Sequence, residues 1–220
     1  MNKGIYTIRM TAVVMMLSIA ACYASAQDFL STKTLTLKKS AGKASYNASV
    51  EFPTEGSPAV LASIMQWMNI VLETEGDFQR NFQKLLQSSC DTFFGYGENW
   101  KRTVEIVRDY EDDNYVTFVS KVTDVDDEKW IAEDCASFSK KDGHRITLDE
   151  IFKCSEEELK QLMWQYRDDI ELDVDDPSGL APMNGGYTDG WILVTSPAHN
   201  STSRSFSLRY EEILSYVNTQ

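Results

Sequence analysis

Three β-rich stretches follow one another between residues 100 and 139, and they constrain the fold more than any other feature of this sequence. They read TVEIVRDY, NYVTFVSKVTDV and KWIAEDCASFS, and acidic turns at Glu111–Asp113 and Asp126–Glu128 separate them. Strands that are neighbours in sequence usually pair in space. The pattern therefore predicts a meander of three antiparallel strands.

The residues before this meander predict two strands and two helices. Apolar side chains alternate at 34–38 and 46–52, which indicates strands with one buried face. Helical spacing of apolar residues follows from Ser57-Pro58 onward, a favourable start for a helix. A second helix is expected to begin at Gly76-Asp77 and to stop at Gly95.

The residues after the meander predict a mixture of short elements. Two capping boxes, Thr147-x-x-Glu150 and Ser155-x-x-Glu158, indicate a helical turn and a longer helix. We expect a loop over 173–190, then a strand at 191–194, another around Phe206 and Leu208, and a short helix at 210–217. The whole pattern predicts an α+β fold, in which an antiparallel sheet meander packs against helices and an N-terminal section supplies strands and a helix pair.

The first 26 residues have the features of a secretory signal peptide. Lys3 and Arg9 precede an apolar run that is too short to cross a bilayer, and Ala24-Ser25-Ala26 is a cleavage motif. A second interpretation stays open, because the residues that end in Cys22 also resemble a lipobox, in which Cys22 would be lipidated. Both interpretations predict export to the periplasm or cell surface of a bacterium, the second with an outer-membrane anchor.

We therefore divide the chain into a signal peptide (1–26), an N-terminal strand and two-helix section (27–99) and an α+β domain (100–220). No transmembrane segment is expected. Acidic residues outnumber Lys and Arg by 34 to 21, which gives a net charge of -13. Nucleic acid and anionic membranes attract basic surfaces, so neither is an expected partner.

Export permits disulfide bonds, and three cysteines follow the signal peptide. Cys135 and Cys154 flank a predicted strand and turn, so they are the better candidates for one disulfide. Cys90 lies on the apolar side of a predicted helix and is expected to be a buried free thiol. The cysteines lack the spacing and the neighbouring histidines of a zinc site.

No motif in the sequence carries a recognisable reaction centre. The acidic repeats Asp124-x-Asp126-x-Glu128 and Asp173-x-Asp175 do not fit a calcium loop, and we interpret them as solvated turns. His144 and His199 lie in turns without a nucleophile or metal motif beside them. We expect no metal and no cofactor, and we interpret the glycines of Gly185-Gly186-Tyr187 as turn residues.

Two tryptophans are the best candidates for surface contacts. Trp100 and Trp130 each begin a predicted strand beside a polar turn, where an indole ring is able to stack on a glycan or a peptide. We add further candidate binding residues from the neighbouring loops: Asp126, Asp127, Tyr187 and His199.

Most of the chain after residue 100 resembles the extracytoplasmic domain of RsiV-type anti-sigma factors. This domain also occurs beside peptidoglycan deacetylase domains and in stand-alone secreted proteins or lipoproteins of Bacteroidetes-like bacteria. Residues 137–153 are similar to its strand, turn and T-L-D-D-L-F segment, 188–194 to its D-D-G and apolar strand, and 207–214 to its closing I-P-Y-S-E-L. The G-G-x-H-G stretch of the family is missing. The resemblance implies a binding module rather than an enzyme, with lysozyme, a cationic protein, as ligand.

These observations together predict a non-enzymatic extracytoplasmic domain that recognises a protein or a cell-wall glycan. Its negative charge would steer a cationic partner toward it. Two alternatives stay open. One is a cell-wall-active hydrolase that uses acidic residues near Trp130 or in the 173–190 loop, and the other is a lipid-anchored structural component of the envelope.

Overall fold

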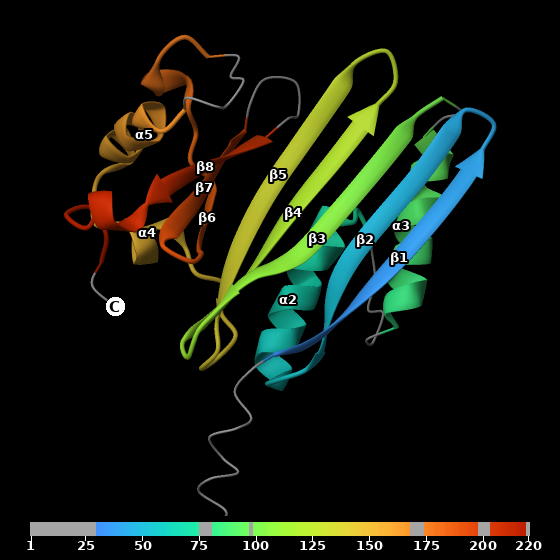
Figure 1. The fold of residues 1–220 in the computed structure, drawn as a ribbon, viewed down its shortest axis with the longest axis horizontal. Coiled ribbons are helices and arrows are strands. Elements are labelled where there is room, and N and C mark those ends of the chain that lie inside the picture. The colour runs from blue at the N-terminus through green and yellow to red at the C-terminus, as the bar shows by residue number, and fades with distance from the viewer. Residues whose placement is uncertain (1–29, 75–80, 97–98, 168–173, 198–202, 219–220) are drawn as a thin grey trace, which may run out of the picture.

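A computed structural model describes residues 30–74, 81–96, 99–167, 174–197 and 203–218. The predicted meander forms the centre of the molecule: β3 (Lys101–Glu111), β4 (Tyr115–Val125) and β5 (Lys129–Ser139) pair antiparallel in this order. Together with β1 and β2 they make a five-stranded sheet of order β1-β2-β3-β4-β5 (Figure 1). The predicted α+β fold class is confirmed.

The N-terminal strands form a hairpin that joins this sheet. β1 (Ser31–Ala41) and β2 (Ala44–Glu55) pair antiparallel around the two-residue turn at Gly42-Lys43. β2 then pairs parallel with β3, a pairing that the sequence analysis did not include. A parallel pairing needs a crossover connection, and here the two N-terminal helices supply it. The sheet therefore runs across the predicted boundary at residue 100.

Two helices cover one face of the sheet. α2 (Pro58–Val71) starts where Ser57-Pro58 predicted it. α3 spans Phe82–Tyr96, and the start that we expected for it, Gly76-Asp77, lies outside the described residues. α3 also continues past Gly95, whose φ is not positive, so Gly95 is not the helix stop that we expected. Figure 1 shows both helices behind the strands, and contacts place α3 on β1 and β2 and α2 on β2 and β5.

The first hydrophobic core lies between these helices and the sheet. Aromatic side chains fill it, and it includes rings from both sections of the chain: Tyr46, Phe52, Trp67, Phe93, Phe118 and Phe138. A core of this kind is the main stabilising contribution to a fold of this size. The two predicted sections thus share one core.

A second, smaller sheet packs against β5. It consists of β6 (Asn184–Tyr187), β7 (Trp191–Pro197) and β8 (Ser203–Arg209) in this order, all antiparallel. β7 and β8 confirm the predicted strands, whereas β6 lies inside the segment that we expected to be a loop. Its glycines are not turn residues: a Cβ on Gly186 would lie 3.0 Å from a methyl of Thr117, and one on Gly185 would lie 2.7 Å from Leu148. Glycine is needed there because β6 approaches its neighbours closely.

Short helices connect the two sheets. The predicted capping boxes are present: α4 (Leu148–Ile151) follows Thr147, and α5 (Glu156–Gln165) follows Ser155. The prediction of a C-terminal helix at 210–217 is wrong, because only a short 3-10 helix forms there, at Tyr210–Glu212. The residues after it form turns and a bridge that bring Val217 against Phe152 in the second hydrophobic core. This packing decides the conformation of so short a segment.

Side chains close the outer edge of β5. Ser203 Oγ donates to the carbonyl of Glu133 at 2.7 Å and accepts the Glu133 amide at 2.9 Å. Arg204 donates to the carbonyl of Ile131 at 2.8 Å, and Arg145 donates to a further β5 carbonyl at 3.0 Å. These bonds satisfy backbone groups that an edge strand otherwise leaves open.

In the part of the chain that the structure describes, no helix combines the length and the apolar character needed to cross a membrane.

Candidate binding groove

A groove of about 530 Å³ opens on the helix-covered face of the sheet, beyond the end of α2. Its floor consists of side chains from β3, β4 and β5, and the end of α2 forms one wall. Residues of β6 and β8 that fold around the β5 edge form the other wall. The groove exists because α2 ends at Val71 while the strands continue past it.

Trp100 and Trp130, which the sequence analysis selected as surface contacts, lie together in this groove. Their rings are stacked, with centroids 5.3 Å apart and planes inclined by 18°. Trp100 directly precedes β3, and Trp130 lies opposite Asp124 in the pairing of β4 with β5. Both residues are half-buried, so the pair presents an aromatic surface to a ligand.

Exposed apolar side chains lie on both walls. Ile70 at the end of α2 is 68% exposed, and Met183 just before β6 is 49% exposed. Val122 and Ala132 continue the apolar surface across the floor. These side chains together give the groove an apolar surface.

An arginine clamp forms the polar end of the groove. Arg102 donates to both carboxylate oxygens of Asp124 at 2.7 Å, and to those of Glu73 at 2.9 and 3.4 Å. Burial alone would lower the pKa of Arg102, but the hydrogen bonds to Asp124 and Glu73 outweigh it and raise this pKa. Glu73 has a φ of 51°, a left-handed conformation that is unusual outside glycine. The clamp therefore fixes the chain at the end of α2 to the sheet.

Asp134 joins the groove to the rest of the fold. One carboxylate oxygen accepts from Trp67 Nε1 at 2.8 Å, and the other accepts from Asn184 Nδ2 at 2.8 Å and from the Cys135 amide at 2.9 Å. Arg145 lies 3.4 Å away. Asp134 thus links α2, β5 and β6, and its hydrogen bonds hold both walls of the groove in place.

Most of the charged side chains that line the groove are acidic. It contains Glu73, Asp124, Glu133 and Asp134 against the single cation Arg102. The carboxylate of Glu133 also pairs with Lys121 at 2.9 Å. Glu73 keeps a side-chain exposure of 45%, which leaves its carboxylate accessible to a ligand. A cationic group therefore complements this groove better than an anionic one.

The other predicted binding residues do not share the groove. Asp126 and Asp127 lie on the turn between β4 and β5, beside a separate hollow that Trp100 also lines. Asp126 accepts the amide of Glu128 at 3.1 Å and so closes the turn. His199 lies outside the described residues.

Tyr187 is not a surface contact, so this prediction is wrong. The residue is only 6% exposed, its ring packs against that of Tyr115 with centroids 5.0 Å apart, and its amide donates to Ser137 Oγ at 2.9 Å. The physical reason is the glycine pair before it, which lets β6 lie directly on β5 and buries the tyrosine between the sheets.

The expected disulfide between Cys135 and Cys154 is not formed, and both thiols are free. Cys135 is fully buried on β5, where its Sγ donates to the carbonyl of Leu193 at 3.8 Å, while Cys154 packs with the second hydrophobic core. Burial raises the pKa of the Cys135 thiol. The prediction of a buried free thiol at Cys90 is confirmed.

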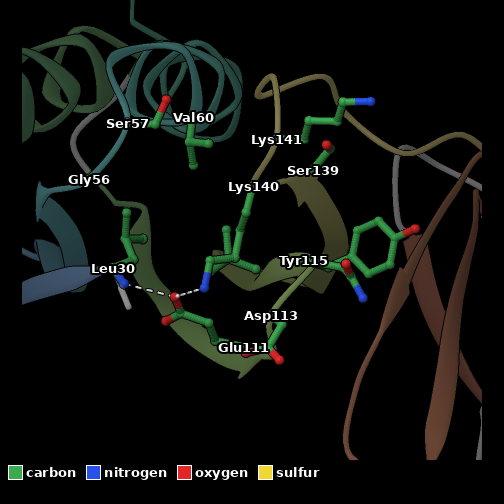
Figure 2. Close-up of a pocket in the computed structure, with 12 residues that line it drawn as sticks. Leu30, Gly56, Ser57, Val60, Glu111, Asp113, Tyr115, Ser139, Lys140 and Lys141 are labelled. Atoms are coloured by element: carbon green, nitrogen blue, oxygen red, sulfur yellow. Dashed lines mark hydrogen bonds and ion pairs between the residues drawn. The ribbon is translucent and has the colours of Figure 1, made fainter. Parts of the chain in front are cut away.

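A second cavity of about 400 Å³ lies where the described chain begins (Figure 2). Glu111 accepts the Leu30 amide at 2.7 Å, and it pairs with Lys140 at 3.2 Å and with Arg108 at 2.7 Å. Arg108 also donates to the Leu30 carbonyl at 2.6 Å. Figure 2 shows Leu30 and Lys140 directed at Glu111. Arg108 also lies 3.8 Å from Glu51, so two carboxylates balance two cations. We therefore interpret these ion pairs as a structural link between the start of β1 and the sheet.

His144 forms a third polar cluster at the turn before α4. Its ring nitrogens lie 2.6 Å from Asp142 and 2.8 Å from Glu150. Hydrogen bonds to Asp142 and then Glu150 raise the pKa of His144, and the bond from His144 lowers the pKa of Asp142 to about 2. No hydroxyl or thiol nucleophile is bonded to this imidazole among the described residues, so the cluster acts as an ion-pair network at a turn.

No group of three or more His, Cys, Asp or Glu side chains that could hold a metal ion occurs in the described ranges.

The fold and the groove define an open-sheet α+β protein that has a surface groove at the junction of its two sheets. No model of a known protein family matches the sequence, and no curated protein matches it either.

Two solved structures have the same fold. One is a member of the DUF3298 family from Bacteroides fragilis NCTC 9343, with a TM-score of 0.66 at 10% identity over 86% of this chain and 94% of that chain. The other is a DUF3298 family protein from Pseudomonas aeruginosa PAO1, with a TM-score of 0.58 at 12% identity over 87% and 96%. The chain thus shares the fold of DUF3298 proteins.

Sequence reasoning found the two tryptophans but missed the rest of the groove. Arg102 was not selected. It shares the hydrophobic alternation of β3 with Arg108, and charged residues in such an alternation were a usable signal for a buried ion pair. Ile70 and Met183 gave no signal, because an apolar residue in a helix or loop is normally assigned to the core.

Proposed function

We propose that this chain is an exported, non-enzymatic binding domain of the DUF3298 type, which holds a positively charged segment of a partner protein in the tryptophan groove. The observation that carries the proposal is the stacked Trp100–Trp130 pair between apolar walls and an acidic lining. This combination suits lysine and arginine side chains.

The chemistry of such a partner matches the groove at two levels. A lysine or arginine places its aliphatic stem along Ile70 and Met183 and its charged end near Glu73. The open aromatic surface of Trp130 also attracts a cation, through the quadrupole of the indole ring. A partner side chain of this kind gains contact area and charge pairing together.

The charge of the whole protein supports the same kind of partner. A net charge of -13 attracts a cationic protein at long range and raises its association rate at low salt. A glycan gains nothing from this field. The groove carboxylates are also engaged within the protein: Asp124 with Arg102, and Asp134 with Trp67 and Asn184. This engagement disfavours a hydrolase, which needs a free acid and a free base.

The proposal is tested with lysozyme as a cationic probe protein. The purified chain binds it at low salt, and Trp130→Ala weakens this binding about tenfold because one stacking surface is lost. The matched control is Trp191→Ala, the same change at a half-buried tryptophan of β7 outside the groove, where Arg209 covers the ring. This control binds as the unmodified protein does.

Three results would contradict the proposal. Equal binding by Trp130→Ala and the unmodified protein would place the interaction elsewhere. Stronger binding to soluble cell-wall glycan than to lysozyme would show that the ligand is a sugar. Release of soluble fragments from purified peptidoglycan would establish the hydrolase.

Export and anchoring belong to the same proposal. The signal peptide supports delivery outside the cytoplasm, with cleavage after Ala26. Mass spectrometry of the protein from its native host distinguishes the two forms, since a mature chain that begins at Gln27 is unmodified and one that begins at Cys22 carries lipid.

A further inference from the structure

The outer edge of β1 presents a long row of unpaired backbone groups. β1 has a single neighbour, β2, and their register runs without a shift from Thr32 to the turn. The two-residue turn makes Ala41 and Ala44 a hydrogen-bonded pair, and bonded pairs alternate along an antiparallel ladder. The amides and carbonyls that point away from β2 therefore belong to alternate residues of β1: Thr32, Thr34, Thr36, Lys38 and Ser40.

The two edges of this sheet are treated differently. The outer edge of β5 is closed by Ser203, Arg204 and Arg145. Nothing in the described part of the chain bonds to the outward backbone groups of β1. β1 contains no proline, and its 11 residues exceed the usual length of a strand. Within the described residues, one edge of the sheet is therefore covered and the other is open to pairing.

The charge along this edge is opposite to that of the whole protein. Residues 31–43 contain four lysines and no acidic residue, in a chain of net charge -13. Lys39 pairs with Asp91 of α3 at 3.0 Å, while Lys33, Lys38 and Lys43 make no ion pair within the described residues. The edge is thus a local cationic strip.

We propose that the outer edge of β1 binds an extended acidic segment of a partner protein by strand addition. Backbone hydrogen bonds supply the affinity of such an interaction, and carboxylates beside the lysines supply its selectivity. The site goes beyond the proposed function, because it uses the edge of the sheet farthest from β5 and selects the opposite charge. A second copy of this chain is a poorer match, since both strands carry the same positive charge and the antiparallel register that overlaps β1 fully would place Lys33 of each copy opposite Lys39 of the other.

The proposal is tested with two short peptides on the purified protein. One alternates threonine with glutamate, and the other alternates threonine with lysine. The glutamate peptide binds in fluorescence anisotropy at low salt, and the lysine peptide does not. Hydrogen exchange then slows at the outward amides of Thr34, Thr36 and Lys38, while the groove keeps its exchange rates.

Three variants make the test specific. Thr36→Pro removes one outward donor without using an amide of the β1–β2 ladder, and it weakens binding of the glutamate peptide about tenfold. Its control, Thr36→Val, keeps the amide and binds normally. The third variant, Lys38→Glu, changes the charge alone, so it weakens binding of the glutamate peptide and strengthens binding of the lysine peptide even if Thr36→Pro fails to fold.

Three outcomes would overturn the strand addition. These are unchanged binding by Thr36→Pro with a normal melting temperature, equal binding of both peptides, and a peptide-free dimer whose β1 amides are protected. The last result would identify a second copy as the occupant.

Discussion

Arg102 is the residue on which the geometry of the groove depends most. Its guanidinium is held between two carboxylates from different elements, Asp124 on β4 and Glu73 after α2. The side chain of Arg102 is only 10% exposed and that of Asp124 17%, so the pair is largely removed from water. Breaking such a pair from one side leaves an uncompensated charge.

Arg102→Ala is expected to destabilise the protein by about 3 kcal/mol, because it leaves Asp124 half-buried without its partner. Glu73→Gln is the matched control, since Glu73 is far more exposed and its loss costs less than about 1 kcal/mol. Urea denaturation monitored by circular dichroism measures both values. A change of similar size in the two variants would contradict this account of the clamp.

His144 makes stability depend on pH. The pKa of His144 is raised in the folded protein. The stability that its charged ring contributes is therefore complete below the pKa of the unfolded chain, about 6.5. It is lost as the pH rises through the folded value. The contribution of Asp142, with its lowered pKa, is present above about 3.9 and is lost as the pH falls toward about 2.

The difference in melting temperature between the unmodified protein and His144→Gln is therefore expected to be largest between roughly pH 4 and 6.5. It shrinks as the pH rises through the folded pKa. Because the cluster is exposed, added salt reduces the difference as well. Thermal unfolding across this pH range measures it, and a difference that grows toward alkaline pH would contradict the assignment.

At the scale of elements, Gly143 determines how the turn after β5 meets α2. Its φ is 79°, and a Cβ at this position would lie 2.5 Å from the backbone carbon of Ala59. Gly42, in the β1–β2 turn, has a similar φ of 62° but open space around it. A comparison of substitutions at the two positions therefore separates the cost of backbone strain from the cost of steric overlap.

Gly42→Ala is expected to cost about 1 kcal/mol, since only the left-handed conformation penalises the new side chain. Gly143→Ala adds a clash with rigid backbone and is expected to cost at least about 3 kcal/mol. Equilibrium unfolding in urea compares the two variants. Equal losses would show that α2 moves aside without cost.

Sequence patterns predicted elements well where local signals and packing agree. The meander of β3, β4 and β5 and both capping boxes were predicted because alternation and caps are local properties. β6 was missed because Gly185-Gly186 has the composition of a turn. It forms a strand because it pairs with β7, and its glycines allow the close approach to β4, β5 and α4. The C-terminal helix failed for a related reason, since packing of Val217 against Phe152 replaces helical bonds.

At the scale of the whole molecule, the two hydrophobic cores share a sheet. Phe93 belongs to the core under the helices, and Phe206 belongs to the core of the small sheet. β5 contacts both regions, with Phe138 on one face and Cys135 against Leu193 on the other. This shared strand couples the two cores.

We therefore expect a single cooperative unfolding transition. Phe93→Ala and Phe206→Ala should each shift the same transition to lower denaturant. Each should lower the free energy of unfolding by about 3–5 kcal/mol, because each creates a cavity in a fully buried region. Circular dichroism and tryptophan fluorescence should report coincident curves. Two separate transitions, each sensitive to one variant, would show that the cores unfold independently.

The groove was predictable only in part, for a reason of scale. Trp100 and Trp130 could be selected singly because each begins a strand next to a polar turn. That their rings stack depends on the register of β5 with β4, and that Met183 and Ile70 line the same groove depends on how the small sheet folds around β5. Both are long-range facts that a local pattern does not contain.

The bonds at Leu30 have a mechanical consequence. The Leu30 amide and carbonyl are both held by charged side chains of β3, through Glu111 and Arg108. A force applied to the residues before Leu30 would therefore act directly on β3, the central strand of the sheet. It would not first separate β1 from β2. The edge strand would therefore withstand forces that unzip a hairpin whose first residue is not held by side chains.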